Sequence, residues 1–151
     1  MTELALTYTD PSAVTVQTAT FAAPRLRVLS SFAPASNDWS SKVEHRLNRL
    51  TKLPVGWDGY KGQRVSPLTA RFVWDLLSSV MTKTTATPSV VPVTGGGLQV
   101  EWHRGGLDIE LYVSKPMKAE LFVSYADDRP DLELELTSDF GALSSALAGL
   151  A

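Results

Sequence analysis

Cysteine is absent from the 151-residue chain, and no apolar run approaches the length that crosses a bilayer. Without cysteine the chain has no disulfide framework, no thiol nucleophile and no thiolate ligand for a metal. The segment Met1–Leu4 also lacks the basic and apolar features of a secretory signal. These absences favour a cytoplasmic protein (in the host cell if a phage encodes it) with no membrane partner.

Glycine is missing from residues 1–36, which are rich in Thr, Ala, Val and Ser and contain several prolines. The alternating pieces Val14–Val16 and Leu26–Val28 indicate extended segments, and the prolines disfavour central strands. We expect residues 1–36 to form an extended N-terminal arm with one or two edge strands, packed on the domain or on a neighbouring subunit. Residues 37–151 are expected to form a single domain.

Basic residues are concentrated in one part of the chain. The net charge of −2 divides into +4 over residues 1–94 and −6 over residues 95–151. Such a division can hold two layers of a fold together or present an acidic surface to a basic partner. A nucleic-acid partner is disfavoured because the pI is near 5.6 and the only basic patch is modest. That patch comprises Lys42, Arg46, Arg49 and Lys52.

Two segments have the apolar spacing of amphipathic helices. In the first, Asp38 to Leu50, Trp39, Val43, Leu47 and Leu50 form one stripe. The second begins with Ser66 as cap and Pro67 at the first helical position, and the threonine-rich run 82–88 ends it. Its predicted apolar face comprises Leu68, Phe72, Val73, Leu76, Leu77 and Val80. A third helix is expected from Ser138 to about Leu150.

After Gly97 the apolar residues recur at every second position, which indicates strands. Only an even-length turn at Gly105-Gly106 keeps both apolar sets on one face, so Trp102 should lie opposite Ile109 and His103 opposite Asp108. The same parity argument places Ile109 opposite Val123 in the third strand. For the fourth strand it places Tyr125 opposite Leu132.

These assignments predict an α+β domain in which a four-stranded antiparallel meander carries helices on one face. The uncovered face would carry mostly acidic residues, with Tyr112 and Phe122 as aromatic anchors. One interpretation is a solvated face that deters aggregation, and a second is an acidic recognition surface for a protein partner. A third is that another element covers this face. The residues assigned to this face are Glu101, His103, Asp108, Glu110, Tyr112, Glu120, Phe122, Glu133 and Glu135.

The stretch LPVGWDGYKG, residues 53–62, places Trp57, Asp58 and Tyr60 among three glycines. Asp58 can accept backbone N–H groups and hold a turn, and both aromatic rings can be buried between the helices and the sheet. This structural interpretation competes with a recognition loop that uses Asp58 and Tyr60. A catalytic role is disfavoured because no His, Cys or second carboxylate lies near Asp58 in the sequence.

GWDGY, the proline at position 67 and the strand sequences GGLQVEW and GGLDIELYV occur in that order. The combination resembles a recurrent pattern in small, mostly uncharacterised bacterial and phage proteins, in which a W-D-G-Y turn precedes a Pro-initiated helix and a G-G-x-Q-x-E-W strand. The resemblance covers about residues 53–113 and implies a loop–helix–hairpin organisation and a mobile-element setting. It implies no activity, cofactor or catalytic residue.

The sequence therefore favours a non-enzymatic protein–protein interaction module without a cofactor. An accessory or inhibitor role, antitoxin-like or anti-defence-like, suits its size and charge, with a basic protein partner bound by the acidic face or the 56–62 loop. One alternative is an assembly component that forms homo-oligomers through residues 1–36. A third is a metal-dependent hydrolase that uses Glu101, His103 and Asp108 as ligands.

Overall fold

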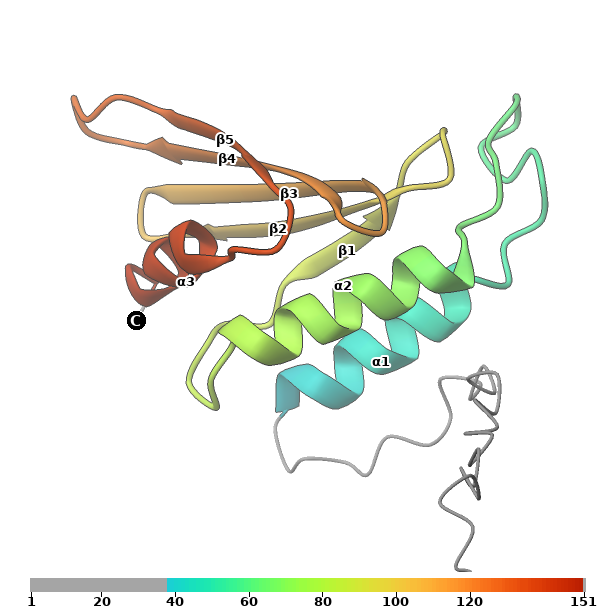
Figure 1. Ribbon diagram of the computed structural model, residues 1–151, viewed down its shortest axis with the longest axis horizontal. Coiled ribbons are helices and arrows are strands. Elements are labelled where there is room, and N and C mark those ends of the chain that lie inside the picture. The colour runs from blue at the N-terminus through green and yellow to red at the C-terminus, as the bar shows by residue number, and fades with distance from the viewer. Residues whose placement is uncertain (1–37, 151) are drawn as a thin grey trace, which may run out of the picture.

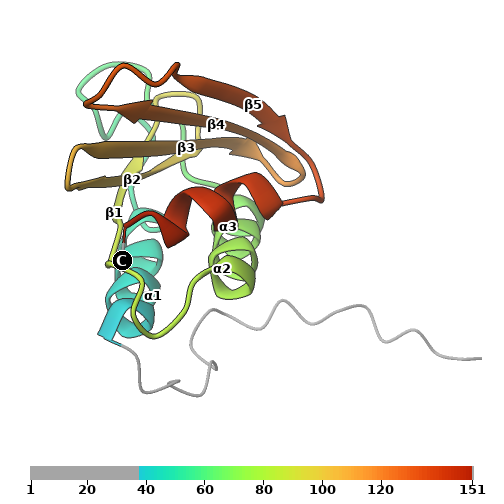
Figure 2. The same cartoon turned by 90° about the vertical axis from the view of Figure 1, so that its left-hand side faces the viewer.

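The computed structural model describes residues 38–150, which form an α+β fold with two layers. One layer is an antiparallel meander of five strands in the order β1-β2-β3-β4-β5, and the other contains three helices on one face of that sheet (Figures 1 and 2). The expected N-terminal arm, residues 1–36, lies outside the described residues. Within the described part, no helix combines the length and the apolar character needed to cross a membrane.

Helix α1 spans Asp38–Leu50, as its stripe of apolar residues predicts. All four residues of that stripe are buried, and the first of them, Trp39, ties the helix to the rest of the fold. The indole N–H of Trp39 donates to the carbonyl oxygen of Thr82 at 3.0 Å. The ring of Trp39 also lies 6.1 Å from that of Trp74 in helix α2, centroid to centroid. Trp39 thereby contacts both α2 and the turn that follows it.

Helix α2 spans Pro67–Val80 and starts where the sequence predicts. The Ser66 hydroxyl accepts the backbone N–H of Leu68 at 3.2 Å, which satisfies one of the unpaired donors at the helix start. The predicted apolar face was partly wrong, because Leu68 is exposed. The buried face is instead turned toward Ala70, Val73, Trp74 and Leu77, since Trp74 packs on α1.

The central strands have the register that the alternation predicts. Strand β2 spans Leu98–Arg104 and β3 spans Leu107–Lys115, and Trp102 lies opposite Ile109. Strand β4 spans Lys118–Tyr125, where Val123 lies opposite Ile109. The side chains of Trp102, Ile109 and Val123 are all buried under the helices. Across these strands, apolar side chains therefore point toward the helices and acidic side chains point to the opposite face of the sheet.

The number of strands was wrong by one, because β1, Ser89–Pro92, precedes the predicted meander. It pairs with β2, with Val90 opposite Val100, and it lies along α1. The pattern hides this strand because it is only four residues long and contains Pro92.

The predicted pairing of the last two strands was also wrong. Strand β5 spans Leu132–Leu136, and Leu132 lies opposite Val123 rather than Tyr125. Tyr125 instead remains paired with Leu107 of β3, and its ring stacks 4.1 Å from the guanidinium carbon of Arg129. The turn between β4 and β5 is therefore longer than expected. Because the shift is two residues, each side chain keeps its predicted face.

Helix α3 spans Gly141–Ala148 and is shorter than the predicted segment, Ser138 to about Leu150. Residues 138–140 are not helical, and the Asp139 carboxylate accepts the Gly141 N–H at 2.8 Å where the helix begins. Leu143 and Leu147 are buried beneath the sheet. Figure 2 shows α3 lying across the layer formed by α1 and α2, so the three helices together cover the inner face.

Candidate functional site: the outer face of the sheet

The sheet face opposite the helices carries the acidic residues that the alternation assigns to it. Its side chains form rows across the strands, because residues directly opposite each other share a face. One row runs Glu101–Glu110–Phe122–Glu133, and a second contains Tyr112, Glu120 and Glu135. We call this surface the outer acidic face, and it consists of Gln99, Glu101, His103, Asp108, Glu110, Tyr112, Glu120, Phe122, Glu133 and Glu135.

On the β2–β3 half of this face, the negative charges are compensated by neighbours. The Gln99 amide donates to Glu101 at 2.8 Å and to Glu110 at 3.3 Å. This amide holds together two carboxylates that lie directly opposite each other and would otherwise repel. This role of Gln99 was not predicted from the sequence, although its position two residues before Glu101 in the strand was the available signal.

His103 links two more carboxylates on the same half. Its Nδ1 lies 2.9 Å from Asp108, and its Nε2 lies 3.6 Å from Glu101. The hydrogen bond to Asp108, helped by Glu101, raises the pKa of His103 above its ordinary value of 6.5 because both carboxylates favour the imidazolium. The predicted cross-strand pairing of His103 with Asp108 is thus confirmed, and the pair gains charge compensation as pH falls.

On the β4–β5 half, the acidic residues have no such compensation. Glu120, Glu133 and Glu135 are exposed, and none has a hydrogen-bond or ion-pair partner among residues 38–150. Phe122 lies between Glu110 and Glu133 and is 37 % exposed. This half therefore presents an aromatic ring surrounded by uncompensated negative charge.

The hydrolase alternative requires Glu101, His103 and Asp108 to converge on one metal ion. The two carboxylates instead engage different nitrogens of the imidazole ring, so they lie on different sides of it. Within the described part of the chain, no group of three His, Asp or Glu side chains is arranged to hold a metal. The geometry does not favour this alternative.

The 56–62 loop is organised by a single carboxylate. Oδ1 of Asp58 accepts the backbone N–H groups of Tyr60 and Gly62, both at 2.9 Å. These two bonds lower the pKa of Asp58 below its ordinary value of 3.8. Gly56 and Gly59 have φ of 77° and 82°, a region that favours glycine. The predicted turn-holding role of Asp58 is confirmed.

The prediction that the loop buries both aromatic rings is wrong. Tyr60 is 88 % exposed, and Trp57 is only half-buried. The indole N–H of Trp57 donates to the Gln63 carbonyl oxygen at 3.0 Å, within the loop itself. The loop lies at the end of the sheet, where the Gln63 N–H donates to the Thr94 carbonyl oxygen at 2.8 Å (Figure 1). It is a pre-shaped loop that displays Tyr60, rather than a joint inside the core.

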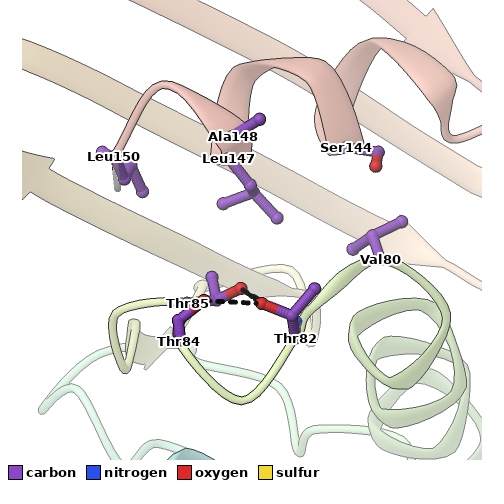
Figure 3. Close-up of a pocket in the computed structure, with 8 residues that line it drawn as sticks. All are labelled: Val80, Thr82, Thr84, Thr85, Ser144, Leu147, Ala148 and Leu150. Carbon is purple, nitrogen blue, oxygen red and sulfur yellow. Dashed lines mark hydrogen bonds between the residues drawn. The ribbon is translucent and has the colours of Figure 1, made fainter.

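A cavity of about 280 Å³ lies between α3 and the threonine-rich turn after α2 (Figure 3). Val80, Leu147, Ala148 and Leu150 line it together with hydroxyl-bearing side chains. The Thr82 hydroxyl is hydrogen-bonded to those of Thr84 and Thr85, both at 3.1 Å. The lining contains no carboxylate, imidazole or amine, so it offers no acid–base group for catalysis.

No known protein family, curated protein or solved structure matches this chain. Among the described residues, the outer acidic face and the 56–62 loop are the two candidate regions for function.

Proposed function

We propose that this protein is a non-enzymatic protein–protein interaction module that binds a basic partner protein through its outer acidic face. The observation that supports this proposal most directly is the exposed ring of Phe122 among glutamates that have no partner in the described residues. Its small size, its charge and the resemblance of residues 53–113 to bacterial and phage proteins favour an accessory or inhibitor role, antitoxin-like or anti-defence-like, in a mobile element.

The arrangement suits recognition for two physical reasons. Aromatic side chains provide the buried anchors of many interfaces, and Phe122 and Tyr112 lie near the centre of the face rather than at its rim. Surrounding carboxylates attract a basic partner and accelerate the encounter, an effect that salt weakens. Gln99 and His103 fix the β2–β3 half, so little order has to be gained there on binding.

Tyr60 provides a second contact point for the same partner. The two bonds to Asp58 hold its backbone in place, so burying the exposed ring on binding would cost little loop entropy. Aromatic residues held on a rigid loop are typical of recognition surfaces.

The test is capture of the partner from an extract of the native host, with variants of the full chain as bait. The double variant Glu133→Lys/Glu135→Lys should lose the partner that the wild-type protein retains, and capture by the wild type should weaken as salt is raised. The matched control is Glu44→Lys/Asp75→Lys, which makes the same change in net charge on the helical layer. Both variants should keep the far-UV circular dichroism of the wild type.

Equal loss of the partner in both double variants would mean that net charge, and not this face, controls binding. Undiminished capture by Glu133→Lys/Glu135→Lys and by Phe122→Ser would remove the basis of the proposal.

A further inference from the structure

The two edges of the sheet differ in how they are closed. At the β1 edge, Nε of Arg46 in α1 donates to the Val90 carbonyl oxygen at 2.8 Å, and Pro92 has no N–H to offer. Strand β5 pairs with β4 only, and within residues 38–150 nothing pairs with its other side. The sheet can therefore accept a further strand alongside β5, because the backbone N–H and C=O groups at an exposed sheet edge can pair with another strand.

The side chains of β5 specify what kind of strand could bind there. Its sequence, LELEL, directs Glu133 and Glu135 to the outer face without partners. Leu134 has the parity of the buried core, yet it is 38 % exposed because no neighbour covers the edge. A fitting strand would alternate basic residues on the outer side with apolar residues on the inner side.

Residues 25–28 of the same chain, RLRV, have this alternation, and Leu29 follows them. We propose that this segment adds to the sheet as a sixth strand alongside β5. Leu26 then lies beside Leu134, while Arg25 and Arg27 lie beside the two glutamates. The central pair is the same whether the strand runs parallel or antiparallel to β5.

A second copy of β5 is a poorer occupant of this edge. Centring an antiparallel pair of β5 strands on Leu134 would place Glu133 of one chain opposite Glu135 of the other, and like charges directly opposite destabilise a sheet. The arginines of residues 25–29 replace that repulsion with two opposite-charge pairs.

The connecting residues, 30–37, are long enough for docking within one chain. When extended they span up to about 26 Å. Trp39, at the start of α1, binds Thr82, which lines the same cavity as Leu147 at the carboxyl end of α3. Helix α3 is about 12 Å long and its other end adjoins β5 (Figure 2). A path along α3 therefore brings residue 29 to the Leu136 end of the β5 edge, where a strand parallel to β5 places it.

The absence of cysteine allows a direct test by cross-linking the purified full chain. The variant Leu26→Cys/Leu134→Cys should form an intrachain disulfide under mild oxidation, because paired strands bring Cα atoms within disulfide range. The control, Leu26→Cys/Val55→Cys, pairs the same residue with an exposed site closer in sequence. We expect the first variant to cross-link at least about tenfold faster, because docking raises the effective concentration of the two thiols.

Exchanging the charges tests whether Arg25 and Arg27 direct the segment to the β5 edge of the sheet. Adding Arg25→Glu/Arg27→Glu to the Leu26→Cys/Leu134→Cys variant should remove the excess rate, and further addition of Glu133→Lys/Glu135→Lys should restore it. Equal rates for the two cysteine pairs, a disulfide-linked dimer as the main product, or failure of the exchange to restore the rate would each overturn the proposal. When docked, this segment occupies Glu133 and Glu135, so the basic partner of the proposed function must displace it to reach these two glutamates. No partner protein is present in the cross-linking assay, so its failure is distinct from failure of the proposed function.

Discussion

Leu121 and Phe122 are neighbours in β4 whose side chains lie on opposite faces of the sheet, and they allow the two-layer arrangement to be tested by substitution. Leu121 is fully buried opposite Leu111, and Phe122 is 37 % exposed opposite Glu110. Truncating each residue to alanine should therefore separate stability from binding: Leu121→Ala should reduce stability, and Phe122→Ala should reduce capture of the partner.

The expected magnitudes follow from burial. Leu121→Ala leaves a cavity in a covered core, which costs about 3–5 kcal/mol of unfolding free energy. Phe122→Ala removes cross-strand contacts on an exposed face, which contribute roughly 1 kcal/mol. For a chain of 151 residues these values correspond to a decrease in Tm of roughly 6–20 °C for Leu121→Ala and 2–4 °C for Phe122→Ala.

Urea denaturation followed by tryptophan fluorescence measures both effects, because Trp39, Trp74 and Trp102 are buried in the folded protein. The midpoint should fall strongly for Leu121→Ala with little change in slope, and only slightly for Phe122→Ala. If Phe122→Ala proved as destabilising as Leu121→Ala, the outer face would have to be covered, and it could not serve as a docking surface.

Two further predictions concern single ionisable groups. Because the folded-state pKa of His103 is raised, the contribution of His103 to stability is full below pH 6.5 and is lost as pH rises through the folded-state pKa. The Tm difference between wild type and His103→Gln should therefore shrink toward high pH. A pH-independent difference would contradict the contact with Asp108. Asp58→Ala should speed hydrogen exchange at the backbone amides of Tyr60 and Gly62, while amides in the core stay protected. Unchanged exchange at these two amides would show that Asp58 does not fix the conformation of the 56–62 loop.

The central register could be predicted because parity leaves few choices. Once Gly105-Gly106 is taken as a two-residue turn, burying both Trp102 and Ile109 permits only one pairing. Side-chain parity does not determine the length of a longer turn, such as the one between β4 and β5. Between β4 and β5 a shift of two residues keeps every face, so the pattern could not detect that Tyr125 stays with β3.

Strand β1 was missed for a different reason, since four residues ending in proline carry too little alternation to be distinguished from a loop. Its position depends on tertiary contacts with β2 and with Arg46 of α1.

For the candidate site, the sequence predicted which residues lie on the outer face of the sheet, but it did not predict how exposed the aromatic side chains of the 56–62 loop are. The sequence places Phe122 and the glutamates on one face, as the structure has them. It could not tell whether Trp57 and Tyr60 turn inward, because that depends on the Asp58 hydrogen bonds and on the hydrogen bond from Gln63 to Thr94, which is distant in sequence. Large aromatic side chains are usually well buried, and local backbone geometry overrides that preference here.

The order of elements along the chain has a consequence for synthesis in the cell. Helices α1 and α2 are translated first, whereas the strands that cover their apolar sides, up to Leu136, follow much later. From the end of α2 to Leu136, at usual elongation rates, this interval is roughly 3–11 s. Until the strands emerge, the apolar sides of the two helices that the sheet later covers remain uncovered, so slow elongation should increase the dependence of the nascent chain on chaperones.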